Sequence, residues 1–142
     1  MTIPISIFLW LTLSFQSEFG VQRVSVSGSE ENYRFTVTLK SDDTGCDQYA
    51  DWWEVITPEG KLLYRRILAH SHVTEQPFAR SGGPVVILPD TEVIVRYHMN
   101  NDGYQLEAMR GSVAKGFDKV KLDKGFGKDL EKADPQPDGC AF

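Results

Sequence analysis

Residues 33 to 40 read Tyr33-Arg34-Phe35-Thr36-Val37-Thr38-Leu39-Lys40, an unbroken alternation of apolar and polar side chains. Successive side chains of a β-strand point to opposite faces of the sheet. The four apolar residues of this run therefore share one face. We predict a strand with one face in a core and the other toward solvent.

Further short apolar segments follow, separated by turn sequences. Val24 and Val26 alternate with polar residues ahead of this strand, and Thr57-Pro58-Glu59-Gly60 has the proline and glycine of a tight turn. About seven short strands with such spacing are typical of an immunoglobulin-like or fibronectin-like antiparallel β-sandwich. The connections are too short for the crossover helices of a parallel sheet. The other expected strands are 52–56, 61–68, 85–88, 92–99 and 104–113.

The composition changes after Lys115, where apolar residues become sparse and Asp134-Pro135-Gln136-Pro137-Asp138-Gly139 reads as a loop. We expect the sandwich at residues 21–114 and an irregular or partly helical tail at 115–142. A short helix could form between Lys119 and Leu130, although the glycines inside it weaken that prediction.

The first residues carry an uncharged run from Ile3 to Phe15. A helix needs about 20 apolar residues to cross a bilayer, whereas this run has the length of the centre of a secretory signal. Residues 1–20 thus predict an export signal, a periplasmic or secreted location and no membrane span in the mature chain. A first strand and a misplaced start are the alternatives, because Met1-Thr2 lacks Lys and Arg.

The overall charge narrows the class of partner. The chain has 142 residues, 41% hydrophobic and 25% charged, with a net charge of −5. These values fit one globular domain. They argue against a nucleic-acid or anionic-membrane partner, which normally meets a basic face. The partner that remains is a protein or small ligand whose identity the sequence does not give.

Two cysteines, Cys46 in a loop and Cys140 near the end, can be interpreted in two ways. In an exported protein they would form one disulfide that joins the tail to the sandwich. In a cytosolic protein they would be two free thiols. Neither cysteine has the CxxC spacing or the neighbouring histidine of a reactive thiol.

Three histidines are the candidates for metal chemistry. His70 and His72 alternate, so an extended backbone puts both rings on one side, and His98 lies opposite the apolar face of its strand. Such imidazoles, with Glu75 or Met99, would suit copper or zinc. The other interpretation is that the histidines brace a loop through hydrogen bonds, and no tetrahedral ligand set is visible.

The paired tryptophans and the arginines are expected to have structural roles. Trp52 and Trp53 must face opposite sides of a strand, so one is expected in the core and the other outside it or under a loop. Arg65, Arg66 and Arg80 are expected to form surface ion pairs with nearby acids, namely Asp51, Glu54 and Glu75. No GxSxG, phosphate-binding loop, HExxH or paired-carboxylate motif is present.

Two motifs carry a resemblance to known proteins. Residues 43–55 and 66–81 fit the pattern DTGxDxYADxWEV followed by RxLxHxHVxEQPFxRS. In this the chain resembles a group of uncharacterised bacterial proteins over about Val21 to Val113. The resemblance implies an exported, compact domain built around residues 70–81 and implies no activity, and Cys140 lies outside it.

We therefore expect an exported, non-catalytic β-sandwich that acts as a binding or structural module and needs no cofactor. The alternative is a small copper- or zinc-binding periplasmic protein that uses His70, His72 and His98. A weaker third hypothesis is an enzyme with its site in the loop from His70 to Arg80. In that case the site would need a concave pocket that holds His70 or His72 next to Glu75 or Arg80.

Overall fold

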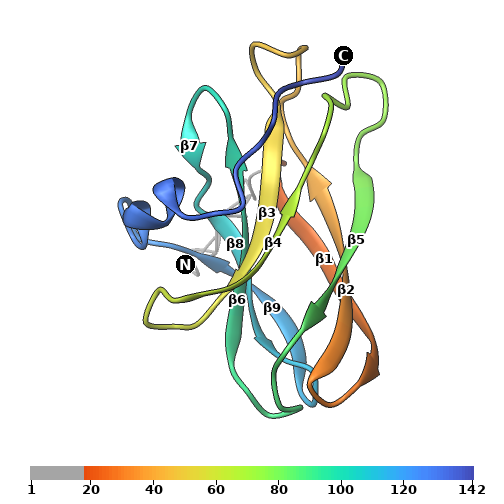
Figure 1. Cartoon of the computed structure of the whole chain (residues 1–142), viewed down its shortest axis with the longest axis vertical. Helices are drawn as coiled ribbons and strands as arrows, with labels where there is room; N and C mark the ends of the chain where they lie inside the picture. Colours follow the sequence, from red (N-terminus) through yellow and green to blue (C-terminus); the bar gives the residue numbers. More distant parts are fainter. Residues whose placement is uncertain (1–17) are drawn as a thin grey trace, which may run out of the picture.

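The structure, a computed structural model, describes residues 18–142 and is a sandwich of two antiparallel sheets (Figure 1). The expected export signal at residues 1–20 thus lies outside the described residues, apart from Glu18, Phe19 and Gly20. The strands are β1 (Gly20–Ser29), β2 (Asn32–Lys40), β3 (Ala50–Ile56), β4 (Leu62–Ile67), β5 (Phe78–Val85), β6 (Val93–Met99), β7 (Gly103–Tyr104), β8 (Glu107–Ser112) and β9 (Gly116–Lys121); a short 3-10 helix, η1, spans Lys128–Lys132.

The strand order confirms the predicted fold class. One sheet has the order β1-β2-β5, and the other has the order β4-β3-β6-β8-β9 with the short β7 paired to β6. The chain crosses between the sheets after β2, β4 and β5, as in Greek-key sandwiches. Hairpins join β1 to β2 and β3 to β4, and the second closes at the predicted turn, where the amide of Gly60 donates to Thr57 O.

The core between the sheets contains the alternating residues that the sequence singled out. Phe35, Val37 and Leu39 are fully buried, whereas Arg34 on the opposite face of β2 is exposed. Trp53 is the largest buried side chain and packs beside Tyr64 of β4. Burial of these large side chains stabilises the two sheets against each other.

The expected boundary at residue 114 needs correction, because the sheet continues through β9. Phe117 of β9 packs edge-on against Phe35 in the core, with ring centroids 5.9 Å apart, and Val120 faces the other side of the sheet. Two apolar residues three positions apart are too weak a signal to predict a strand. The short helix that follows, η1, is 3-10 and begins later than the sequence suggested.

Two further strand predictions also change. The strand expected at residues 85–88 instead runs from Phe78 to Val85, and the one expected at 104–113 is divided into β7 and β8. β5 lacks apolar alternation because Gly82 lies under the Tyr64 ring, where a Cβ atom would come within 2.4 Å of the Tyr64 hydroxyl oxygen. Pro84 is tolerated because β5 is an edge strand of its sheet.

Strands β3 and β6 are buried on both faces. Their second face, turned away from β1-β2-β5, is called the outer face here and carries Trp52, Glu54, Ile56, Ile94, Arg96 and His98. The segment from Leu122 to Phe142, called the tail, covers part of this face: Phe126 and Leu130 pack against a buried cluster that includes Ile56 and Ile94. Figure 1 shows the tail passing η1 and then running along β3 to the end of the sandwich.

Candidate functional site

A buried ion-pair cluster lies at the centre of the outer face. Glu54 of β3 is completely buried and accepts hydrogen bonds from Arg65 Nε of β4 and Arg96 Nε of β6, each at 2.9 Å. The strand register brings these three side chains together, because Glu54 is paired with Arg65 on β4 and with Arg96 on β6. The expected surface pair of Arg65 and Glu54 is therefore a buried one, since the tail covers it.

The two guanidinium groups also hold the tail. Arg65 donates to the main-chain oxygens of Leu130, Ala133 and Pro135, and Arg96 donates to those of Phe126 and Gly127, over 2.5–3.0 Å. Charge-assisted hydrogen bonds of this kind are the stronger ones in proteins. We call Glu54, Arg65 and Arg96 the arginine clamp.

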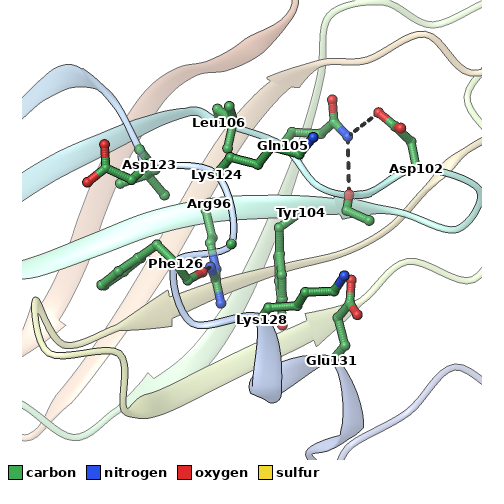
Figure 2. A pocket seen from close by; sticks show the side chains of 13 residues that line it. Arg96, Asp102, Tyr104, Gln105, Leu106, Asp123, Lys124, Phe126, Lys128 and Glu131 are labelled. Carbon is green, nitrogen blue, oxygen red and sulfur yellow. Dashed lines mark hydrogen bonds between the residues drawn. The ribbon is translucent and has the colours of Figure 1, made fainter.

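Beside the clamp, a small pocket of about 170 Å³ lies between the β7 turn and the loop from Leu122 to Lys128 (Figure 2). Its floor is Arg96, whose Cζ lies 3.5 Å from the centroid of the Tyr104 ring. Burial and the Glu54 carboxylate raise the pKa of the Tyr104 phenol. Both groups are thus engaged with neighbours: Arg96 is held by Glu54, and Tyr104 is held in its neutral form.

His98 forms a second polar group further along the outer face. Its Nδ1 lies 2.6 Å from Asp51 Oδ1, and its Nε2 lies 3.3 Å from Glu131 Oε1 of η1. The imidazole is stacked flat on Trp52, with ring centroids 3.8 Å apart, and Arg65 covers Trp52 as well at 4.4 Å. The ring is thus held between two carboxylates, one on the sheet and one on the tail.

The His98 group borders an open pocket of about 550 Å³. One wall consists of Tyr49, Asp51, Trp52, His98 and Asn100, and the facing wall consists of Gln136 to Gly139 of the tail. The pocket presents carboxylates, amides and an imidazole, which are groups that bind polar ligands. We call it the His98 pocket.

His70 and His72 form a separate cluster. Their ring centroids are 4.4 Å apart, and His72 is stacked on Phe78 of β5 at 3.7 Å. Arg80 Nη2 lies 3.0 Å from His72 Nε2. Because arginine can only donate, Nε2 accepts and the neutral ring carries its proton on Nδ1, which is buried and has no hydrogen-bond partner.

Several contacts fix this cluster in place. Burial, Arg80 and His70 together lower the pKa of the His72 imidazole, which favours its neutral form. Asp43 receives a hydrogen bond from the backbone amide of His72 at 2.8 Å and one from the amide of Ala50 at 2.9 Å. The DTG motif thereby ties the histidine loop to the start of β3.

The structure brings only two of the three candidate metal ligands together. His70 and His72 are neighbours, whereas His98 has Asp51, Trp52 and Glu131 around it. Of the additional ligands considered, Met99 is in the core and Glu75 pairs with Arg80 at the surface. Within residues 18–142, no group of three His, Cys, Asp or Glu side chains is arranged to hold a metal ion.

The two cysteines are joined as a disulfide, with Cα atoms 5.6 Å apart and 94 positions apart in sequence. Cys46 lies in the loop before β3, and Cys140 lies near the end of the tail. The tail is thus attached to the sandwich both by the arginine clamp and by a covalent bond. The tryptophan prediction is also confirmed, because Trp53 is in the core and Trp52 lies under the tail.

Sequence reasoning missed Arg96 and Glu131 as members of these groups. The signal for Arg96 was present, since a lone charge inside the apolar run Val93-Ile94-Val95-Arg96 indicates a buried, paired group. Glu131 gave no signal, because its contact with His98 depends on where the tail folds back.

Fold and site together define an all-β, two-sheet sandwich with a clamped and disulfide-linked tail. No family model matches the chain, and no solved structure matches it. The chain is similar to a protein from the archaeon Halomicrobium mukohataei described as "Putative lipoprotein", with 49% identity over 75 residues. The match covers 53% of this chain and 37% of that relative, so the chain spans little more than a third of its length.

Proposed function

We propose that this chain is an exported, non-catalytic β-sandwich module of the cell envelope or extracellular space, which binds a ligand or partner or has a structural role. The observation that carries the proposal is the Cys46–Cys140 disulfide. Disulfides persist in oxidising compartments and are rare in the cytosol. The likeness to a protein described as a lipoprotein supports the same location. None of the helices in residues 18–142 has the length and apolar character that a bilayer crossing needs.

A non-catalytic role is supported by the way the charged groups are used. Glu54, Arg65 and Arg96 are engaged with one another and with tail carbonyls. His98 has a carboxylate at each nitrogen, and the accepting nitrogen of His72 is occupied by Arg80. A general base needs a nitrogen that is free to meet substrate. The His98 pocket is the surface that we propose for a polar ligand.

The location is tested by producing the full chain from residue 1 in a bacterial host and separating the cell fractions. Free thiols are trapped with a maleimide before lysis, and the intact mass is measured. We expect a shortened chain outside the cytoplasm that takes up no maleimide. The Cys140→Ser variant is the control and should take up one maleimide. A full-length cytoplasmic chain with two labelled thiols would contradict the proposal.

Metal binding is the second candidate function. It is favoured by the closeness of the His70 and His72 rings. Arg80 opposes it, because its positive charge lies at the other nitrogen of that ring. Titration of the wild type, His72→Ala and His98→Ala with Zn²⁺ or Cu²⁺ decides the question. A stoichiometric site that is lost only in His72→Ala would establish this function, and the absence of such a site would remove it.

A further inference from the structure

The tail is attached to the sandwich at two separate places. Toward its start, the arginine clamp holds main-chain oxygens as far as Pro135. At its far end, the Cys46–Cys140 disulfide is accompanied by three hydrogen bonds: the amide of Ala141 donates to Ala69 O, and both the amide and the hydroxyl of Ser71 donate to Phe142 O. The two attachments are therefore of different chemical kinds.

The stretch between these attachments, Gln136 to Gly139, is called the strap. It forms the tail wall of the His98 pocket and is largely exposed. Its only hydrogen bonds in the described structure run from Gln136 Nε2 to the oxygens of Glu131 and Ala133, which belong to the tail itself. Within the described residues, the strap thus forms a wall of the pocket without hydrogen bonds to the sheet, and its ends determine its position.

The disulfide that fixes the far end can be reached from solvent. Cys46 is exposed and Cys140 is partly exposed. Exposed disulfides are more often the ones that are reduced and re-formed than buried ones are. The clamp at the other end is chemically inert to thiols, and its central carboxylate, Glu54, is fully buried.

From this arrangement we propose that the Cys46–Cys140 bond is a redox latch. It holds the strap in place as the tail wall of the His98 pocket, and its reduction releases the strap and widens the pocket; the inference rests on the proposed role of this pocket in ligand binding. The reductant is a dithiol. One thiolate attacks a sulfur of the disulfide, the S–S bond breaks, and a mixed disulfide forms. The second thiol then displaces the protein sulfur, so the dithiol becomes a disulfide while Cys46 and Cys140 each end with a proton.

Opening is confined to the far end of the tail. After reduction, the hydrogen bonds to Ala69 and from Ser71 and the stacking of Phe142 on His70 hold that end, whereas the five clamp hydrogen bonds remain. Local opening of a weakly attached segment requires much less free energy than unfolding of the core. The pocket then loses its tail wall and widens, so a larger polar ligand can reach the side of the pocket that contains Asp51 and His98.

Hydrogen exchange measured by NMR on the full chain, with and without dithiothreitol, tests the latch. The amides of Ser71 and Ala141 report on the far end, and the amides of Leu130 and Ala133 report on the clamped part, because each of the four donates to a main-chain oxygen. On reduction we expect exchange at Ser71 and Ala141 to become at least about tenfold faster, and exchange at the clamped amides and in β3 and β6 to stay unchanged.

Two controls make the result decisive. A variant with both cysteines changed to serine should exchange rapidly at Ser71 and Ala141 whether or not dithiothreitol is present. Broadening of the NMR signals of the His98 ring protons by a neutral, soluble gadolinium chelate reports directly on the pocket and should increase on reduction. The latch is overturned if Ser71 and Ala141 stay protected after reduction, if the broadening at His98 does not change, or if the amides of β3 and β6 lose protection together with the tail.

Discussion

The arginine clamp allows the sharpest quantitative prediction, the effect of Glu54→Gln on stability. The glutamine keeps the shape of the side chain but removes its charge, and its amide nitrogen opposes one of the guanidinium donors. All three side chains of the clamp are at most 1% exposed. Removing one partner of a buried ion pair costs about 3–5 kcal/mol, because the remaining charges stay buried without compensation.

The matched control is Glu92→Gln, which removes the carboxylate from an ion pair of the same chemistry at the surface. Glu92 pairs with Arg110 at 2.7 Å, but the two side chains are 54% and 44% exposed. An exposed pair contributes about 0–1 kcal/mol, so this variant should be close to the wild type. The comparison separates burial from the mere loss of a glutamate.

Urea unfolding followed by tryptophan fluorescence, with the disulfide intact, measures both changes in the free energy of unfolding. We expect Glu54→Gln to lose about 3–5 kcal/mol, which in a chain of this size lowers Tm by roughly 10–20 °C. The slope against urea should stay the same, because the folded state still buries the same surface. A loss for Glu54→Gln no larger than that of Glu92→Gln would refute the interpretation of the clamp as a buried, tail-holding group.

Two further outcomes follow from the core and from the histidine loop. Phe117→Ala should destabilise the domain by about 1–3 kcal/mol in the same urea assay, because a partly buried aromatic contact with Phe35 is lost and β9 is weakened. The control Val86→Ala changes an exposed side chain and should have little effect. Equal losses of stability in the two variants would argue against β9 as part of the core. The pKa of His72 is lowered in the folded state, so the unfolded chain binds more protons than the folded chain below about pH 6.5. Acidification through that range should therefore lower the free energy of unfolding more in the wild type than in His72→Phe. Identical pH dependence of the two proteins in urea unfolding from about pH 7.5 to 5 would contradict this.

The strands of the sandwich were predictable from the sequence where one face of the strand is exposed to solvent, because apolar and polar residues then alternate. Phe35 and its neighbours alternate with polar residues, and the Thr57–Gly60 turn has the local sequence that such turns require. The strands β5 and β9 were not predictable in the same way. Gly82 in β5 leaves room for the Tyr64 ring of β4, a strand of the other sheet, and Phe117 in β9 is one apolar residue in a polar segment.

The candidate sites likewise differ in how far local sequence predicts them. The closeness of His70 and His72 follows from local alternation, and the structure places their rings together. The groups around His98 and Glu54 depend on strand register and on the path of the tail, neither of which the sequence displays locally. A charge such as Arg96 in an apolar run does indicate a buried pair, but its partner becomes visible only when the strands are aligned.

The way in which the clamp grips the tail has a consequence for how freely that segment can change. The guanidinium groups recognise carbonyl oxygens of the backbone, which all amino acids share. Most positions from 126 to 135 can therefore exchange their side chains over evolutionary time without loosening the attachment. Phe126, Leu130 and Glu131 are exceptions, because their side chains contact the outer face. Gly127 is another, because its φ of 58° and the Arg96 Nη2 atom, 3.0 Å from where a Cβ would lie, leave little room for any other residue.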